Sequence, residues 1–463
     1  MKFCESKFSS AGCRRNPRGS QRASVLVIVM LIAFGLISIA LYFAHSMTFE
    51  LRASDNRASG MVTEQAIEGA ARYVSYMLAT YATNGVMPTN NEFACAAVPI
   101  GDAHFWLIGR DPSGTSSSDP YFGLMDEASK LNLNKANTNV LSYLPNMTLD
   151  FADAIVDWRG TNSTMSLNYS SLGYATKEAP FETVDELRLV YGAAMDLLVG
   201  NDIDQNGVLD ANEQNVNSSG QWDPGLFEYV TVYTREPNFH SDGTLLTNVN
   251  SASEADLEAL FQNAGVSDAS GLATRLYDNM HAISAMPRNS TSGMMDFCVR
   301  CKNAGMSSSD FAKIADDITT STNAYIYGRV NVNTASVPVL EALFMGLNVD
   351  QQTASGAAQS LLTYREQNPN NLVSIAWVID ALGTTSSVVN ALATGDYVTT
   401  RSFQFTADIA AIGPYGRGYR RVKFIFDTSN GAPKIIYRQD LTRLGWALGE
   451  KVRETWVTQR SNG

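Results

Sequence analysis

The sequence predicts an α+β protein in which a long N-terminal helix leads into an antiparallel sheet and a large helical domain is inserted into that sheet. Three observations support this fold class. An apolar run over 25–44 continues as a helical pattern to Tyr81 without a proline. One strand-like segment, 103–110, follows the helix, and the matching strand-like segments come only near the C-terminus. The long stretch between them is mostly helical in pattern.

The composition is that of a folded protein larger than one compact core. With 463 residues, two or three domains are expected beyond the N-terminus. The hydrophobic share of 45% and the charged share of 17% are typical of globular chains. A formal charge of −12 repels nucleic-acid phosphates, so binding to nucleic acid is not expected.

The N-terminus predicts a membrane anchor. Residues 1–23 contain six Lys and Arg residues against Glu5 alone, and they lead into an apolar run long enough to cross a bilayer core of about 30 Å. The apolar part of a cleaved signal peptide is shorter. The basic flank predicts that the rest of the chain lies outside the cytoplasm. Beyond the membrane, Ile67, Ala70, Val74 and Leu78 share one helical face, which we expect to pack on the sheet. A plain signal anchor is the alternative interpretation of this segment.

A short basic leader containing glycine, an apolar run and an amphipathic continuation together resemble the N-terminus of type IV pilins and pseudopilins. In that family a prepilin peptidase cuts on the cytoplasmic side. The resemblance implies a cut between Ala23 and Ser24, with a cut between Gly19 and Ser20 as the alternative. Most pilins carry a glutamate at the fifth mature position, where this chain has Ile28 or Ser24. The K-type minor pseudopilin of the type II secretion system is similar in lacking that glutamate.

The order of segments over nearly the whole chain also resembles a K-type pseudopilin, in which a helical domain interrupts a pilin-like sheet. The expected segments are a leader (1–23), the transmembrane and amphipathic helix (24–85), the first part of the sheet (86–129), a first helical unit (130–237), a variable insertion (238–324), a second helical unit (325–395), the C-terminal strands (396–449) and a tail (450–463). The insertion at 238–324 lies outside the resemblance.

The helical units contain an internal repeat. Residues 130–134 and 329–333 both read as an Asn-x-Asn segment, and a leucine follows each at the same spacing, Leu141 and Leu340. The second copy resembles the start of a helix-hairpin-helix module. Such modules grip DNA through a glycine-rich hairpin. The corresponding segment, 345–351, has one glycine and an acid, which favours a protein-packing role.

One segment predicts a metal site. Residues 202–213 match the EF-hand calcium loop at each diagnostic position, and Gly207 permits the sharp turn. The expected calcium ligands are Asp202, Asp204, Asn206, the carbonyl of Val208, Asp210 and Glu213. Because no second helix is expected after the loop, the site is predicted to be structural and to hold 222–233 against the helical domain. A solvated acidic loop is the alternative.

The cysteines predict a structural disulfide. Cys298 and Cys301 form a Cys-x-x-Cys pair, but a zinc site needs two more ligands and His281 is the sole nearby histidine. Redox catalysis would need a thioredoxin-like setting. We therefore expect a short-range disulfide or a link to Cys95.

No catalytic motif is present, and the four histidines are scattered singly, so an enzyme is not expected. The family resemblance implies a minor pseudopilin in the inner membrane with its body in the periplasm, placed at the pseudopilus tip, where it starts assembly and supports protein export. Its implied partners are other minor pseudopilins, the major pseudopilin, the inner-membrane assembly platform and the prepilin peptidase. One alternative is a competence or type IV pilus-like component that binds DNA or surfaces. Another is an anchored periplasmic protein that calcium stabilises.

Overall fold

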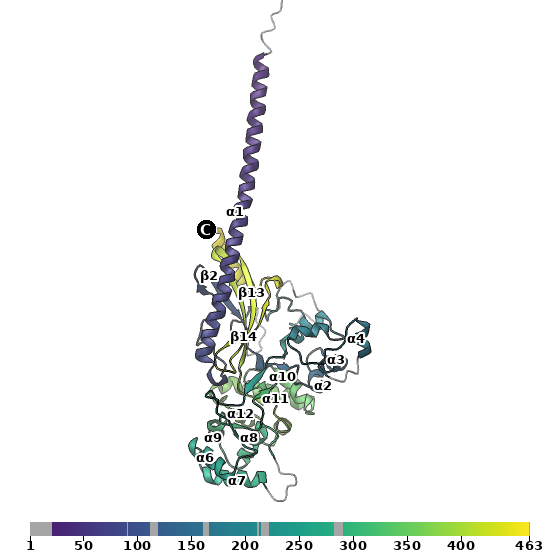
Figure 1. Cartoon of the computed structure of the whole chain (residues 1–463), viewed down its shortest axis with the longest axis vertical. Helices are drawn as coiled ribbons and strands as arrows, with labels where there is room; N and C mark the ends of the chain where they lie inside the picture. The colour runs from purple at the N-terminus through teal and green to yellow at the C-terminus, as the bar shows by residue number, and fades with distance from the viewer. Residues whose placement is uncertain are drawn as a thin grey trace, which may run out of the picture. The chain divides into compact units, whose positions relative to one another are not determined.

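The computed structural model describes residues 21–89, 91–111, 119–160, 166–210, 213, 222–281 and 290–462 (Figure 1). The chain divides into two compact units between Ser59 and Gly60. Helix α1 (Gln21–Tyr81) contributes to both units. Its extent confirms the long N-terminal helix that the sequence predicts.

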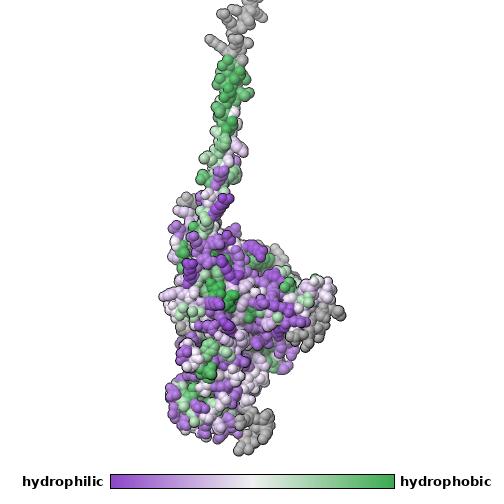
Figure 2. Space-filling model, viewed as in Figure 1, coloured by the Kyte–Doolittle hydropathy of each residue, from purple (hydrophilic) through white to green (hydrophobic). Residues whose placement is uncertain are grey.

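The first part of α1 has no apolar partner within its own unit. Every residue from Val25 to Ala58 is exposed, and Figure 2 shows that the first part of this stretch has a strongly hydrophobic surface. By length and composition the helix can cross a membrane, since its most apolar window has a mean hydropathy of 2.9 and none of that window is buried. An exposed apolar surface of this size is unfavourable in water, so lipid or other protein must cover it.

The second unit contains an antiparallel sheet assembled from the two ends of its chain (Figure 1). The strand order is β1 (Val98–Ile100), β2 (Ala103–Ile108), β12 (Gln404–Ile412), β13 (Tyr419–Asp427) and β14 (Lys434–Asp440), and β3 (Met125–Asp126) also pairs with β12. Each pairing is antiparallel, and Ile108 lies opposite Asp408 although three hundred residues separate them in the chain. The split antiparallel sheet predicted from the sequence is confirmed.

The two faces of this sheet differ in chemistry because side chains alternate along each strand. On one face Phe405 and Phe424 are buried against Val74 and Leu78 of α1. The helical face predicted from the sequence therefore packs on the sheet. The opposite face is mixed, with charged side chains such as Asp408 and Arg421 and a separate apolar cluster that includes Trp106 and Ile412. Apolar burial thus holds the helix on one face, whereas the other face combines polar contacts with a smaller apolar cluster.

The inserted domain occupies the chain between β3 and β12 and has one continuous apolar core, which runs from Leu131 to Val398. The segments predicted as a first unit, an insertion and a second unit all contribute to it. Its elements are η2 (Glu127–Ser129), β4 (Leu131–Asn132), α2 (Thr138–Ser142), α3 (Leu149–Arg159), α4 (Ser166–Ser171), η3 (Val184–Leu189), α5 (Met195–Val199), η4 (Leu226–Glu228), β5 (Val230–Thr231), β6 (Arg235–Pro237), β7 (Thr247–Asn248), α6 (Glu254–Asn263), α7 (Ala269–His281), α8 (Met294–Asn303), α9 (Ser308–Ile314), β8 (Ile318–Thr319), β9 (Tyr325–Tyr327), β10 (Val330–Asn331), α10 (Val337–Gly346), α11 (Gln351–Gln367), η5 (Pro369–Asn371), α12 (Ala376–Leu382), α13 (Ser387–Leu392) and β11 (Val398–Thr399).

The repeat in this domain occurs three times. Each copy opens with a two-residue strand that pairs in parallel with a later strand, as β4 with β5, β7 with β8, and β10 with β11. In each copy the first asparagine of Asn-x-Asn accepts a hydrogen bond from the amide of the second, in the pairs Asn132 and Asn134 (2.8 Å), Asn248 and Asn250 (3.0 Å), and Asn331 and Asn333 (2.9 Å). The segment 238–324, expected as a variable insertion, therefore contains a third copy of the module.

The described chain also has three short helical turns that belong neither to the strands of the sheet nor to the inserted domain. They are η1 (Thr83–Gly85), η6 (Pro414–Gly416) and η7 (Thr442–Leu444). The segment expected as a tail is a helix, α14 (Gly449–Asn462). Its Trp456 ring lies 5.9 Å from that of Trp106 on β2 and 4.8 Å from that of His104. The C-terminal helix is thus held to the sheet by aromatic packing.

Candidate metal centre

The segment that matches a calcium loop begins directly after α5 and is closed at its base. The amide of Asn201 donates to the carbonyl of Asp223 at 2.8 Å, and the amide of Asp223 donates to Asn201 Oδ1 at 2.7 Å. Gly200 has a φ of +65°, and a Cβ there would lie 2.0 Å from the Asp223 carbonyl oxygen, so only glycine fits. The expected helix before the loop is short, because only η3 and α5 are helical over 184–199.

Backbone amides turn the loop around its own carboxylates. Asp202 accepts hydrogen bonds from the amides of Asn206 and Gly207, both at 2.9 Å. Glu213, at the far end, accepts from the amides of Asp204 and Asp210, both at 3.1 Å. Gly207 has a φ of +87°, as a sharp turn at this position requires. The described residues of the pattern, 202–210 and 213, therefore form a closed loop with the carboxylates of Asp202 and Glu213 directed inward.

Three of these carboxylates lie close together. The ligand atoms of Asp202, Asp204 and Glu213 all lie within 4.8 Å of one another, and all three residues are buried. Burial raises the pKa of each, and the neighbouring Asp202 helps to raise that of Asp204 to about 8. Two full negative charges 4.8 Å apart repel by about 3.5 kcal/mol at an effective dielectric constant near 20. The cluster is therefore unfavourable at neutral pH unless protons or a cation compensate it.

The donor atoms fit calcium. The cluster offers carboxylate oxygens, the hard ligands that calcium prefers, and Asn206 is fully buried beside it. The Asn206 side chain donates to Asp210 at 3.1 Å and to Asp204 at 3.3 Å, and its Oδ1 accepts from the amide of Val208 at 2.9 Å. Of the six predicted ligands, Asp210 lies outside the group of three carboxylates that meet. Asp210 is the ninth residue of the loop, a position that often binds calcium through a water molecule.

Three residues outside the pattern contact the loop, and two of them, both arginines, were not foreseen from the sequence. Trp222 donates from Nε1 to Asp202 at 3.4 Å, which holds the chain after the loop as expected. Arg421, on β13, donates to the carbonyls of Asp204 and Gln205. Arg110, after β2, also donates to the Gln205 carbonyl, at 3.3 Å. No local signal marks either arginine, because both are distant from the loop in sequence.

A solved structure is similar to this chain over most of its length. The chain is similar to one chain of the GspK-GspI-GspJ complex. That structure is from the type 2 secretion system of enterotoxigenic Escherichia coli, and the match covers 84% of this chain and 99% of that one, with a TM-score of 0.42 and 10% sequence identity. No protein-family model matches the sequence, and no curated protein is similar to it. The structural similarity is weak, so the function proposed below rests on the chain's own sequence and architecture.

The expected disulfide is absent. Cys298 and Cys301 are free, fully buried neighbours on α8, and burial raises the pKa of both thiols. Residues three apart on a helix have Cβ atoms about 5–6 Å apart, too far for an unstrained disulfide. Cys95 is also free and donates to the Phe122 carbonyl at 3.2 Å. It packs against the core between helix and sheet, apart from the core of the inserted domain that contains the other two.

The two candidate cleavage sites differ in position. Gly19 and Ser20 lie outside the described residues, whereas Ala23 and Ser24 belong to the first turn of α1. A cut after Ala23 would leave a mature chain that begins within this helix, directly before its apolar stretch.

Proposed function

We propose that this protein is a minor pseudopilin of a type II secretion system, anchored in the inner membrane with its body in the periplasm. The observation that carries the proposal is one uninterrupted helix with two kinds of surface. Residues 25–58 are exposed and largely apolar, and the later residues Ile67, Val74 and Leu78 are buried against an antiparallel sheet. Lipid can cover the apolar stretch before assembly. The same stretches of neighbouring subunits can cover it afterwards, as in a helical bundle.

A position at the tip follows from two features. The fifth mature residue is Ile28 or Ser24, so the chain lacks the glutamate that pairs a pilin with the subunit above it. The inserted domain spans 127–399 and makes the body far larger than a sheet and helix alone. A bulky body without that pairing group suits the end of a filament. There it would start assembly, contact other minor pseudopilins and then the major pseudopilin and the assembly platform, and support export.

Calcium is proposed as a structural cofactor of the inserted domain. The buried carboxylates of Asp202, Asp204 and Glu213 supply the negative charge, and the closed loop supplies the geometry. The ion would contribute charge compensation and crosslinking of the loop, with no catalytic role. Because extracytoplasmic calcium is abundant, even a site of millimolar affinity would be occupied.

A DNA-binding role is less well supported. The helix pair α10 and α11 would have to present a backbone amide nest to phosphate at the start of α11. Instead, the Asp350 carboxylate caps that helix and accepts from the amide of Thr353 at 3.0 Å. An acid at this position repels phosphate.

The proposal is tested by the N-terminal residue of the protein purified from membranes, with active or inactive prepilin peptidase. The expected result is Ser24, or Ser20, only when the peptidase is active. An intact Met1, or a cut beyond the apolar run, in both strains would sink the pseudopilin proposal. Crosslinking from Ile28 to other minor pseudopilins then tests the position at the tip.

A further inference from the structure

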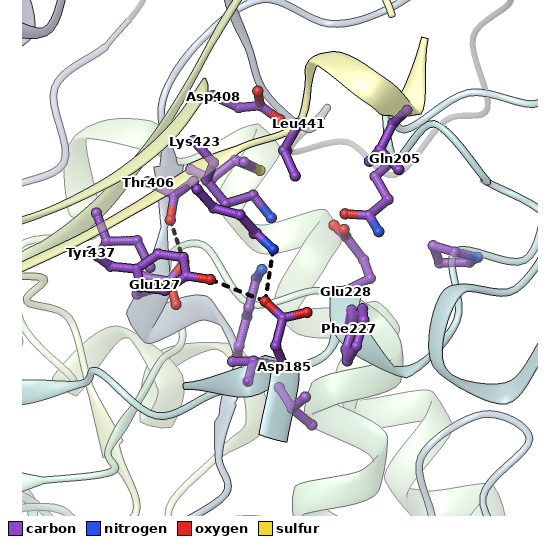
Figure 3. A pocket seen from close by; sticks show the side chains of 18 of the residues that line it. Glu127, Asp185, Gln205, Phe227, Glu228, Thr406, Asp408, Lys423, Tyr437 and Leu441 are labelled. Atoms are coloured by element: carbon purple, nitrogen blue, oxygen red, sulfur yellow. Dashed lines mark hydrogen bonds between the residues drawn. The ribbon is translucent and has the colours of Figure 1, made fainter. Parts of the chain in front are cut away.

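The inserted domain and the sheet are joined by a polar boundary. Their buried apolar residues form separate clusters, one within the inserted domain and one between the sheet and α1. A pocket of about 130 Å³ lies along the boundary, and Figure 3 shows sheet side chains facing those of the inserted domain across it. Its lining includes Thr406, Asp408 and Lys423 from the sheet and Asp185, Gln205 and Glu228 from the inserted domain. Besides apolar side chains such as Phe227 and Leu441, specific polar contacts therefore hold these two parts together.

Several of those contacts end on the calcium loop. Arg421 is fully buried and binds Asp408 through two hydrogen bonds, Nε at 2.9 Å and Nη2 at 2.7 Å. Its remaining donors cross the boundary to the carbonyl of Asp204 and, at 2.8 Å, to that of Gln205. A planar guanidinium held by a carboxylate presents these donors in a fixed direction. The arginine therefore fits one backbone conformation of the loop.

Arg110 makes a second link at the same place. It donates from Nε to Glu228 at 3.0 Å and from Nη2 to the Gln205 carbonyl at 3.3 Å. A Cβ on Gly207 would lie 2.9 Å from Arg110 Cδ, so the loop packs closely against this side chain as well. Both arginines come from the sheet region, and both can donate to the loop only when its backbone has this conformation.

We propose that calcium in the 202–213 loop fixes the inserted domain on the sheet through Arg421 and Arg110. This inference rests on the proposed calcium site. Without the ion, nothing crosslinks the three buried carboxylates, so a more open loop in which they separate and meet water becomes accessible, and it moves the carbonyls of Asp204 and Gln205 away from the arginines. With the ion, the loop closes and the arginines bind it. Calcium binding and attachment of the domain are then coupled, and each strengthens the other.

The first test measures calcium affinity of the full chain in detergent micelles by isothermal titration calorimetry. The test variant carries Arg421→Met together with Asp408→Leu. Replacing both partners avoids an unpaired buried charge and keeps the net charge beside the loop unchanged. The coupling predicts about tenfold weaker calcium binding. The matched control, Arg401→Met with Asp316→Leu, removes another Arg–Asp pair, which is joined by three hydrogen bonds and is distant from the loop in sequence, and is expected to bind calcium as the wild type does.

The second test follows the boundary directly. Spin labels on unnatural residues introduced at Leu149 of α3 and Lys434 of β14, both exposed, report the distance between the inserted domain and the sheet. With calcium the distance distribution is expected to be narrow, and with a chelator it is expected to broaden. The Arg421 and Asp408 double variant is expected to stay broad even when calcium saturates it. Should that variant not fold, Arg110→Met with Glu228→Gln replaces it, which again keeps the net charge unchanged, and a smaller effect of about threefold on affinity is expected from losing one of the two links.

The outcomes separate the two proposals. If the wild-type chain binds no calcium, the calcium site itself is wrong, and the coupling falls with it. A second outcome is that calcium binds, neither variant changes its affinity, and the distance distribution is the same with and without calcium. In that case the calcium site stands and the coupling is overturned. An equal loss of affinity in the Arg401 and Asp316 control would also overturn the coupling, because the effect would then reflect general destabilisation.

Discussion

Calcium binding to the loop should release about one proton at pH 7. The perturbation is the addition of calcium to the metal-free protein. Burial and the nearby Asp202 raise the pKa of Asp204 to about 8, so at pH 7 about nine-tenths of the molecules carry a proton on this group. A calcium ligand must be deprotonated, and the proton leaves as the ion binds. At pH 9 the release should fall to about a tenth of a proton, and calcium affinity should rise with pH up to about 8.

The raised pKa of Asp204 also determines whether the stability of the metal-free fold rises or falls with pH. Because the pKa of Asp204 is higher in the fold than in the unfolded chain, the metal-free fold binds more protons between about pH 4 and pH 8. Its stability is therefore fully present below this window and declines as the pH rises through it. Calcium should reverse the decline, since the loaded loop favours the ionised carboxylate.

The assay is calorimetric titration of calcium at pH 7 in buffers of different ionisation enthalpy. The slope of the observed enthalpy against the buffer enthalpy gives the number of protons released. A matched titration of Asp204→Asn should show weaker binding and almost no proton release. Normal calcium binding by the wild type with no proton release at pH 7 would refute the reasoning, because the three carboxylates would then be ionised without the ion.

Three further predictions concern the rest of the body. Burial raises the pKa of Glu236 to about 7, so the wild type should lose up to about 3 kcal/mol of stability between pH 4.5 and 7 in denaturant titrations, and Glu236→Gln should remove most of that loss. Val74→Asp places a charge between helix and sheet and should lower the free energy of unfolding by about 3 kcal/mol or more, whereas the exposed control Tyr76→Asp should change it by less than about 0.5 kcal/mol. Cys298 and Cys301 should resist iodoacetamide in the native chain and react in urea without a reductant; protection that persists in urea would point to a disulfide instead.

Local periodicity was enough to predict the elements that short-range physics controls. The long helix follows from an unbroken apolar and then amphipathic pattern, and α1 ends at Tyr81, where that pattern ends. The strands β12 and β13 follow from alternating side chains. The acidic loop could be identified because its candidate ligands, its turn and its closing acid all lie within twelve consecutive residues.

The third copy of the module was not predicted from the sequence. Its opening segment, 247–252, carries the same Asn-x-Asn pattern as the other copies, but the motif is short and its helices differ in sequence. The strand that identifies the module, Ile318–Thr319, pairs with Thr247–Asn248 some seventy residues earlier. The disulfide expectation failed for a related reason, since the spacing of Cys298 and Cys301 does not reveal that both lie within one continuous buried helix.

By itself, then, the sequence predicted the anchor helix, the individual strands β12 and β13 and the candidate ligands of the loop, because each depends on residues close together in the chain. Only the tertiary structure decided which groups surround that loop. Arg110 and Arg421 lie about a hundred residues before it and two hundred after it, and they meet at Gln205 because β2 and β13 both flank β12 in one sheet. Charge compensation and attachment at a buried site depend on distance in space, and the fold sets that distance.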